Sequence, residues 1–293
     1  MPSPDAQELL DELRDGLARR LADGDDAKAV YEEAMAEFPA PEGTALERGE
    51  LGGAPSLRVV APGAAEEPGI LYLHGGGFAV GSAESNQDLL ARLSHGARVA
   101  AVGIDYPLLP DARFPVALEA ALAAYRELVE AGPPPVLAGS SAGGGLALSA
   151  AMRLRDCGEP APPGLVFLSA WFDLTVSAPS IEAVSDGDWL GRETLVIAAE
   201  TYLDGRADTD PVASPLHGDL SGLPRMLIQV GGSEILLDDA QRLADAARRD
   251  GTPAELDVWP GMFHNFQLFG SRLEEGAAAL ERAGEWARQR LAG

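Results

Sequence analysis

The 293-residue sequence predicts an α/β fold, a mostly parallel sheet with helices on both faces. Short apolar runs bounded by Gly and Pro recur along the chain, and amphipathic helical periods lie between them. A hydrophobic content of 46% is enough for a substantial core in one large domain or two small ones. The longest apolar runs fall far below the roughly 20 residues that a membrane span requires. We therefore expect no transmembrane helix and no membrane partner.

The elements follow one another along the chain. The first 38 residues contain two amphipathic helical periods, separated by a break at 23–26. Seven apolar runs then indicate buried strands: Leu57–Val60, Ile70–Leu73, Val99–Ile104, Val136–Ala138, Leu165–Ser169, Met226–Val230 and Leu256–Trp259. Between them, one helical period starts at Pro115 and ends at Gly132, and another covers Asp238–Asp250. This alternation of strands and helices predicts parallel pairing.

One interval breaks the alternation. About 50 residues separate the run ending at Ser169 from the run beginning at Met226, which is too long for a single crossover. The interval contains a helical period at Arg192–Leu203 with prolines on both sides. We therefore expect an excursion of the chain over the sheet.

Charge and cysteine content exclude several classes of function. The chain carries 46 acidic and 22 basic residues, a net charge of −24, so phosphate backbones and anionic lipid surfaces are repelled. We expect no nucleic-acid partner. Cys157 is the single cysteine, which excludes an intrachain disulfide and a cysteine-based zinc cluster, and we expect no metal. The N-terminus lacks the pattern of a secretory signal, so a cytoplasmic location is expected.

A Gly-x-Ser-x-Gly motif lies between an apolar run and a helical period. The segment Gly139-Ser140-Ser141-Ala142-Gly143 follows Val136–Ala138 and leads into the helical period from Leu146. This is the context of a nucleophile elbow, a sharp turn that exposes a strained serine. The alternatives are a glycine-rich packing turn and a phosphate cradle. The phosphate cradle is disfavoured, because no Lys follows and the Gly-x-Gly-x-x-Gly spacing is absent, and the elbow is the favoured interpretation.

A second glycine-rich segment, His74-Gly75-Gly76-Gly77-Phe78, directly follows the run Ile70–Leu73. Acyl transfer needs N–H donors aimed at a developing oxyanion, and the unencumbered amides of such a loop can supply two. Ala142, directly after the serine, can supply a third. His74 comes too early in the chain for the base of a triad, so we expect its ring to anchor the loop by hydrogen bonding.

A serine nucleophile needs a base and an orienting acid. Four histidines are present: His74, His95, His217 and His264. Only His264 follows a late strand, where a loop at the carboxyl edge of the sheet would return to Ser141. Without the serine motif, a satisfied buried histidine would be the favoured interpretation. The acid should lie between nucleophile and base along the chain, and the segment Gly231–Asp239 supplies it.

Together these motifs resemble the hormone-sensitive-lipase-like family of α/β-hydrolases, the bacterial family IV carboxylesterases. Asp105–Pro110 and Asp210–Leu216 are also similar to blocks of that family, so the resemblance covers nearly the whole chain. It implies an α/β-hydrolase fold with an eight-stranded sheet in a catalytic domain over 46–293. It further implies a helical cap made of the N-terminal helices, 1–45, and the excursion 174–215.

The resemblance also implies the absence of a cofactor, and it suggests Gly76, Gly77 and Ala142 as the oxyanion donors. Within the family, the chain is similar to the branch of acetyl-hydrolases and monoterpene-lactone hydrolases. Dimers are common in the family, so a homodimer is an expectation. Two positions depart from the family pattern: Ser140 replaces the Asp of the usual elbow, and Glu234-Ile235-Leu236 replaces the usual Asp-Pro-Leu.

The second departure leaves the acid open between Glu234 and Asp238. A carboxylate at a helix start can cap the free N–H groups there, which explains Asp238 and Asp239 without catalysis. Glu234 instead precedes the apolar run Ile235–Leu237 and would be costly to bury unless it were paired. We therefore favour Glu234 as the acid.

The sequence thus predicts a serine carboxylesterase acting on a small-molecule ester. Ser141 attacks the ester carbonyl, His264 takes and returns the proton, and Glu234 orients the imidazole. We expect short acyl chains, because no exposed apolar stretch suits a lipid interface. Candidate pocket walls are Phe78, Trp171, Trp189, Tyr202, Met262 and Phe266.

Other functions on the same scaffold stay open. One is a deacetylase or lactone hydrolase that acts on a biosynthetic or catabolic intermediate. A lyase is disfavoured because the family's dehydratases have an altered oxyanion loop, and the glycines are intact here. A non-catalytic small-molecule receptor is also disfavoured, because the family's receptors have lost the histidine that His264 represents.

Overall fold

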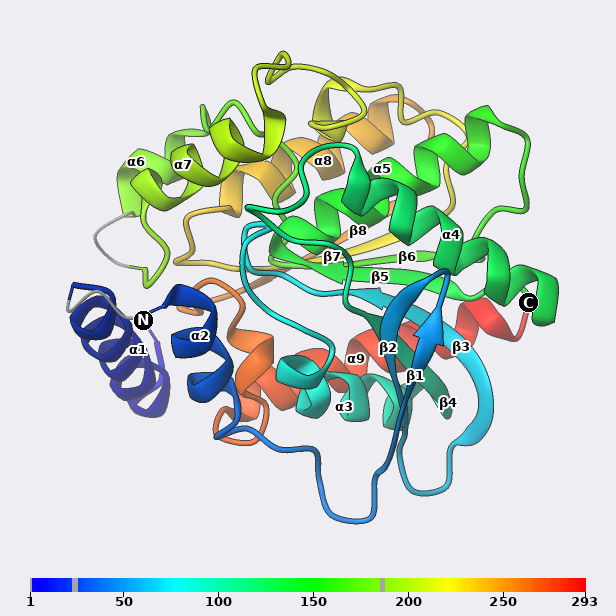
Figure 1. The fold of residues 1–293 in the computed structure, drawn as a ribbon, viewed down its shortest axis with the longest axis horizontal. Coiled ribbons are helices and arrows are strands. Elements are labelled where there is room, and N and C mark those ends of the chain that lie inside the picture. Colours follow the sequence, from blue (N-terminus) through cyan, green and yellow to red (C-terminus); the bar gives the residue numbers. More distant parts are fainter. Residues whose placement is uncertain (1, 23–25, 185–187) are drawn as a thin grey trace.

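The computed structural model describes residues 2–22, 26–184 and 188–293 (Figure 1), without the side chains of 17–19, 21 and 22. An eight-stranded sheet runs through its centre in the order β1-β2-β4-β3-β5-β6-β7-β8. The strands are β1 Ala45–Leu51, β2 Ala54–Val60, β3 Ala65–Leu73, β4 Val99–Ile104, β5 Val136–Ser140, β6 Leu165–Leu168, β7 Met226–Gly231 and β8 Ala254–Trp259. Strand β2 pairs antiparallel with β1 and β4, and all later neighbours are parallel.

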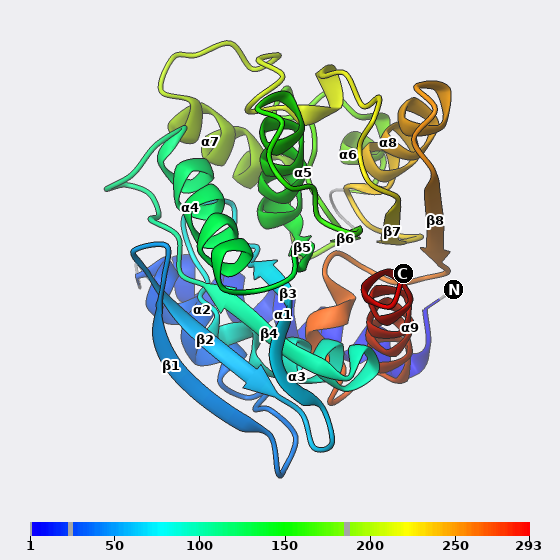
Figure 2. The same cartoon turned by 90° about the vertical axis from the view of Figure 1, so that its right-hand side faces the viewer.

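Helices cover both faces of this sheet (Figure 2). The α-helices are α1 Pro4–Ala22, α2 Ala27–Met35, α3 Gln87–Ala97, α4 Val116–Ala131, α5 Ser141–Asp156, α6 Pro179–Val184, α7 Arg192–Leu203, α8 Leu237–Arg249 and α9 Glu274–Leu291. Short 3₁₀ turns occupy Glu84–Asn86, Pro215–His217 and Phe266–Phe269. Helices α3 and α9 pack on one face, and α4, α5 and α8 pack on the other.

The central strands are buried on both sides because successive side chains point to opposite faces. In β3, Leu71 and Leu73 join the core beneath α4, α5 and α8, whereas Ile70 and Tyr72 join the core beneath α3 and α9. Strand β5 is likewise buried at every residue. Both core layers therefore hold the carboxyl ends of β3 and β5 rigidly side by side.

The predicted α/β architecture is confirmed, and the seven apolar runs coincide with strands, except that Ser169 lies one residue beyond the end of β6. The helix predicted from Pro115 to Gly132 is α4, and that of Asp238–Asp250 is α8. Strand β1 carried no apolar run, because it is an edge strand with mostly exposed side chains. Its signal was the pair Gly52-Gly53, both with positive φ, which forms the hairpin to β2.

Helices α1, α2, α6 and α7 lie beyond the carboxyl ends of the central strands, at the left of Figure 1. Strand β1 begins at Ala45, next to the boundary predicted for the N-terminal cap, and the interval 174–215 contains α6 and α7. The division into cap and catalytic domains stays a prediction. The break predicted at 23–26 lies largely outside the described residues.

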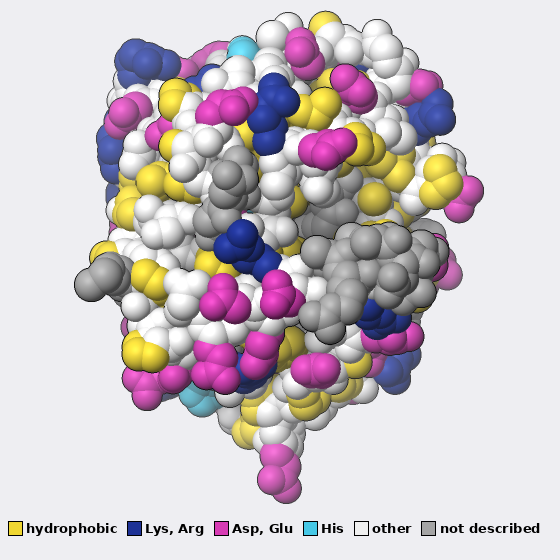
Figure 3. Space-filling model, turned by 90° about the vertical axis from the view of Figure 1, so that its left-hand side faces the viewer, with side chains coloured by type: hydrophobic (Ala, Val, Ile, Leu, Met, Phe, Trp, Pro, Cys, Tyr) yellow, Lys and Arg dark blue, Asp and Glu magenta, His cyan; other side chains and the backbone are white. Residues whose placement is uncertain are grey.

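Acidic side chains are scattered over this side of the molecule among hydrophobic, Lys and Arg side chains (Figure 3). None of the helices in the described part of the chain combines the length and the apolar character that crossing a membrane requires.

Candidate active site

Ser141 stands at the turn between β5 and α5, as the Gly-x-Ser-x-Gly motif predicts. Its φ of +47° is the strained conformation of a nucleophile elbow. A Cβ at Gly139 would collide with the backbone of Gly143, and a Cβ at Gly143 would collide with the carbonyl oxygens of Leu73 and His74. The two glycines are therefore required, because the start of α5 lies directly against the ends of β3 and β5.

Ser140 fills the position where the resembled family has Asp. Its hydroxyl lies 2.7 Å from the hydroxyl of Tyr72, which in turn lies 2.9 Å from Asn86 Oδ1. Ser140 is thus held in a neutral polar network beneath the elbow.

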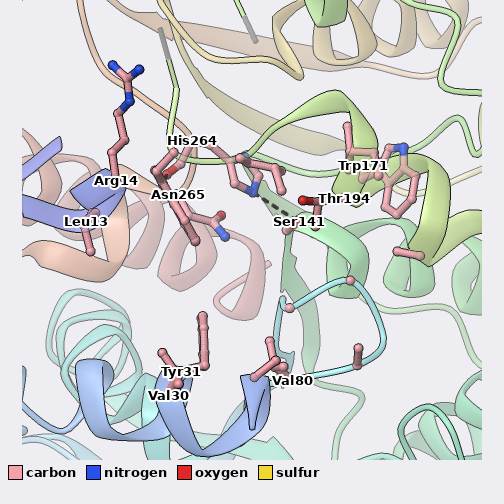
Figure 4. Close-up of a pocket in the computed structure, with 18 residues that line it drawn as sticks. Leu13, Arg14, Val30, Tyr31, Val80, Ser141, Trp171, Thr194, His264 and Asn265 are labelled. Carbon is pink, nitrogen blue, oxygen red and sulfur yellow. Dashed lines mark hydrogen bonds between the residues drawn. The ribbon is translucent and has the colours of Figure 1, made fainter. Parts of the chain in front are cut away.

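The loop after β8 brings His264 to Ser141. The Nε2 atom of His264 lies 3.1 Å from Ser141 Oγ (Figure 4), and both side chains are buried. The distance is within the range in which a base can take the proton of a serine hydroxyl. The sequence separation of 123 residues shows that the sheet, and no local motif, makes this contact.

Glu234 completes the line from serine to histidine to carboxylate. Its Oε1 atom lies 3.3 Å from Nδ1 of His264, and its side chain is fully buried. The other oxygen, Oε2, accepts hydrogen bonds from the Gly231 N–H at 2.6 Å and from the Ser169 hydroxyl at 2.7 Å. These two donors fix the carboxylate so that Oε1 remains directed at the imidazole.

Asp238 and Asp239 are occupied elsewhere. Asp238 Oδ2 accepts the N–H of Ser180 at 2.7 Å, and Asp239 Oδ2 accepts the N–H groups of Phe172 and Asp173. The expectation that they cap their own helix is wrong, since the N–H of Asp238 at the start of α8 donates to the hydroxyl of Ser180 at 3.1 Å, and the N-cap residue makes no side-chain bond. The reason is tertiary: the free N–H groups that they meet belong to the start of α6 and to the segment after β6.

The glycine loop faces the same serine. Gly76 and Gly77 have φ of +112° and +59° and line one cavity together with Ser141. Their N–H groups donate to no acceptor within the described part of the chain. Ala142 lies in the first turn of α5, where N–H groups have no intrahelical partner. Three amide donors thus lie free near Ser141.

His74 anchors this loop, as expected. Its Nδ1 atom lies 2.7 Å from the carbonyl oxygen of Gly75, and its ring stacks on Tyr106 with centroids 4.3 Å apart. Burial lowers the pKa of His74 below its ordinary value, so the ring is neutral near pH 7. A neutral ring held in this way positions the loop.

A cavity of about 410 Å³ opens over Ser141 and His264. Residues of α1, α2 and α7 line it together with the glycine loop (Figure 4). The walls are mostly apolar: Leu13, Val30, Tyr31, Val80, Trp171, Trp189, Leu190, Leu195 and Ala198. A mostly apolar cavity with few convergent polar groups is typical of a small-molecule site.

The six candidate wall residues separate into two groups. Trp171 and Trp189 line this cavity. The structure places the other four outside its lining: Phe78, Tyr202, Met262 and Phe266. Phe78 and Tyr202 stack on each other with centroids 3.7 Å apart, so they pack behind the wall and support it.

Ser169 and Asp188 were missed by the sequence analysis. Ser169 has a φ of +47° at the end of β6 and donates to Glu234. The signal in the sequence was a polar residue at the end of an apolar run. Asp188 is buried beside His264 and Glu234. Burial raises the pKa of Asp188 to about 6, although the nearby His264 opposes the shift. Nothing in the sequence around Asp188 indicated that it reaches this site.

The residues that the structure describes include no group of three or more His, Cys, Asp and Glu side chains arranged to hold a metal ion. Ser141, His264 and the glycine loop meet at the cavity, and Glu234 contacts the imidazole of His264. A hydroxyl, an imidazole, a carboxylate and free amide donors are the groups that acyl transfer uses.

A family model described as alpha/beta hydrolase fold matches residues 70–268. The chain belongs to the α/β-hydrolase family. An acetyl-hydrolase from Streptomyces hygroscopicus is 44% identical to this hydrolase over 228 residues, which cover 75% of each chain. An esterase from Acinetobacter venetianus is 35% identical over 223 residues, which cover 74% of each chain.

Solved structures agree with this assignment. The crystal structure of an esterase from the bacterial hormone-sensitive lipase family matches the hydrolase with a TM-score of 0.94 and 37% identity, covering 99% of both chains. The resemblance inferred from the motifs is therefore confirmed, and the hydrolase is a member of this esterase family.

Proposed function

We propose that the enzyme hydrolyses short-acyl esters of small molecules through a triad of Ser141, His264 and Glu234. The observation that carries the proposal is the continuous line of contacts, 3.1 Å from Ser141 Oγ to His264 Nε2 and 3.3 Å from Nδ1 to Glu234 Oε1. The order nucleophile, acid, base along the chain also fits this fold family.

In the first half of the reaction, Ser141 Oγ bonds to the ester carbonyl carbon while His264 Nε2 takes the hydroxyl proton. The carbonyl oxygen becomes an oxyanion, which the amides of Gly76, Gly77 and Ala142 stabilise. Glu234 holds the imidazolium in its orientation. The bond to the alcohol oxygen then breaks, and the alcohol leaves with the proton from Nε2.

In the second half, water attacks the acyl-enzyme and gives its proton to His264 Nε2. The resulting tetrahedral intermediate collapses, the bond to Ser141 Oγ breaks, and the serine recovers its proton as the carboxylic acid leaves. No group outside the chain, water and substrate is needed to balance these steps.

Cavity size and relatives support small substrates. A volume of about 410 Å³ lies near the lower end of the range for small-molecule sites. The relative from Streptomyces hygroscopicus is named an acetyl-hydrolase. We infer that acetyl and other short acyl groups are preferred, with the apolar walls from α1, α2 and α7 acting as the cap over the substrate.

Substitution of Ser141 by Ala tests the mechanism. Hydrolysis of p-nitrophenyl acetate should fall by about 10⁶-fold, because only binding and the oxyanion donors remain. A fluorophosphonate should label the native enzyme at Ser141 and leave the variant unlabelled. Thermal melting, measured on both proteins, should change little. Retention of more than about a tenth of the activity in Ser141→Ala would show that the mechanism is wrong.

Acyl-chain preference tests the substrate class. Across p-nitrophenyl acetate, butyrate, octanoate and palmitate, we expect kcat/KM to be highest at the short end and to fall steeply once the acyl chain outgrows the cavity. Equal kcat/KM for acetate and palmitate would contradict the short-acyl assignment while leaving the triad untouched.

A further inference from the structure

Asp188 and Trp189 form a short segment before α7 that lies against the loop of His264. The side chain of Asp188 is only 4% exposed. Trp189 is partly buried and lines the active-site cavity. This 188–189 segment therefore touches both the cavity and the backbone of the proposed base.

The carboxylate of Asp188 joins the two loops that carry base and acid. The N–H of His264 lies 3.2 Å from both Oδ1 and Oδ2 of Asp188. The N–H of Ile235, the residue directly after Glu234, donates to Oδ2 at 3.0 Å. Oδ1 also accepts the N–H of Trp189 at 2.8 Å. The buried side chain of Asp188 thus connects Ile235, the residue after Glu234, to His264.

Trp189 bonds to the carbonyl group of His264. Its indole N–H donates to the carbonyl oxygen of His264 at 2.7 Å. His264 lies in a turn, outside any helix or strand, so no regular ladder satisfies its backbone groups. Instead, the N–H of His264 donates to the side chain of Asp188, and its carbonyl oxygen accepts from the side chain of the next residue, Trp189.

The charge of Asp188 acts on the same group. The titratable side chains that face it are His264 and Glu234, and within the described residues no Lys or Arg forms an ion pair with it. Burial raises the pKa of Asp188, and repulsion from Glu234 adds to this shift. A negative charge on Asp188 therefore lies close to the ring that takes the proton in the proposed transition state.

We propose that Asp188 and Trp189 are positioning residues for the base: together they clamp the His264 backbone so that its ring stands between Ser141 and Glu234. The inference rests on the proposed triad and extends it to a segment that no motif marks. The physical reason is that a shift of about 1 Å in a reacting group lowers the rate by about 10²-fold.

The test compares Asp188→Asn, Trp189→Phe and their double variant with the native enzyme, using p-nitrophenyl acetate. Asp188→Asn should lower kcat by about 10- to 100-fold with KM nearly unchanged. Trp189→Phe keeps an aromatic wall, loses the indole N–H, and should lower kcat by about 2- to 12-fold.

If the two residues act as one clamp, the double variant should lose less than the product of the single effects. Asp173→Asn is the matched control, since Asp173 is a buried carboxylate that pairs with Arg242 and His217 and does not touch His264. It should lower the melting temperature and leave kcat unchanged.

A native kcat in Asp188→Asn overturns the clamp, as does an equal loss of kcat in Asp173→Asn. If Asp188→Asn does not fold, Trp189→Phe decides, and a native kcat there overturns the proposal. Ser141→Ala distinguishes failure of the clamp from failure of the triad. If Ser141→Ala is inactive and the variants of Asp188 and Trp189 are fully active, the clamp is refuted and the triad is not.

Discussion

Two pairs of buried carboxylates lie near the carboxyl edge of the sheet, and they differ in what faces them. Glu234 and Asp188 face His264, and their remaining partners are backbone N–H groups and a serine hydroxyl. In the ranges that the structure describes, neither forms an ion pair with Lys or Arg. The charges of this pair are therefore available to an imidazolium.

The second pair, Asp173 and Asp239, faces a cation. Arg242 Nη1 lies 2.8 Å from Asp173 Oδ2 and 3.7 Å from Asp239 Oδ1. Burial alone would raise the pKa of Asp173, but hydrogen bonds from Thr175 and His217 hold it below its ordinary value. Burial raises the pKa of Asp239 to about 7.

All four carboxylates are buried, so the two pairs differ in their neighbours and not in their burial. A carboxylate neutralised by arginine stabilises the segments it joins, and a carboxylate that faces only histidine can support catalysis. Variants of each pair should therefore affect different measurements.

The largest expected effect is at Glu234. Glu234→Gln should lower kcat by about 10⁴-fold with little change in KM, because the amide cannot hold the imidazole in the correct tautomer. Steady-state kinetics with p-nitrophenyl acetate measure it. An active Glu234→Gln beside an inactive Asp238→Asn would instead transfer the role of the acid to Asp238.

On the structural side, Asp173→Asn should lower the free energy of unfolding by about 1–3 kcal/mol. It removes charge-assisted hydrogen bonds to His217 and to an arginine that is partly exposed. Urea denaturation followed by circular dichroism measures the change. A stability equal to that of the native enzyme would show that this carboxylate contributes nothing to the fold.

Asp239 makes stability depend on pH. Because its pKa is raised in the folded state, it binds its proton more tightly there than in the unfolded chain, so its stabilising effect is full below about pH 4. That effect should disappear as pH rises to about 7. Between pH 5 and 8, the melting temperature of Asp239→Asn should therefore fall less than that of the native enzyme. An equal fall in the melting temperatures of the two proteins between pH 5 and 8 would contradict this prediction.

The smallest effect is expected at Asp238. Asp238→Asn weakens one contact, with the N–H of Ser180, and should cost about 1 kcal/mol or less of stability while kcat stays native. Melting temperature and kcat measured on the same preparation check both statements. A tenfold loss of kcat would contradict this prediction and would show that the contact between α6 and α8 also affects catalysis.

Local patterns in the sequence predicted the parts of the site that depend on local sterics. The turn at Ser141 needs glycine at positions 139 and 143, and both glycines lie within a five-residue motif that can be recognised in the sequence. The same holds for the buried strands, whose apolar runs are continuous because both faces are covered. Strand β1 was missed because an exposed edge strand needs no apolar run.

Contacts between distant segments were not predictable in this way. Asp188 meets His264 across 76 residues, and no local pattern distinguishes it from the many other acidic residues of the chain. Phe78 and Tyr202 are aromatic, as pocket walls often are, but only the packing of α7 on the glycine loop decides that they stack behind the wall.

The sequence by itself determined the fold class, the elbow serine, the glycine loop and the late histidine, because short-range sterics and periodicity constrain them. Only the tertiary structure decided which carboxylate faces the imidazole, which aromatic rings line the cavity and which segment holds the base. Those outcomes depend on how burial brings remote side chains together, and burial is a property of the whole packed chain.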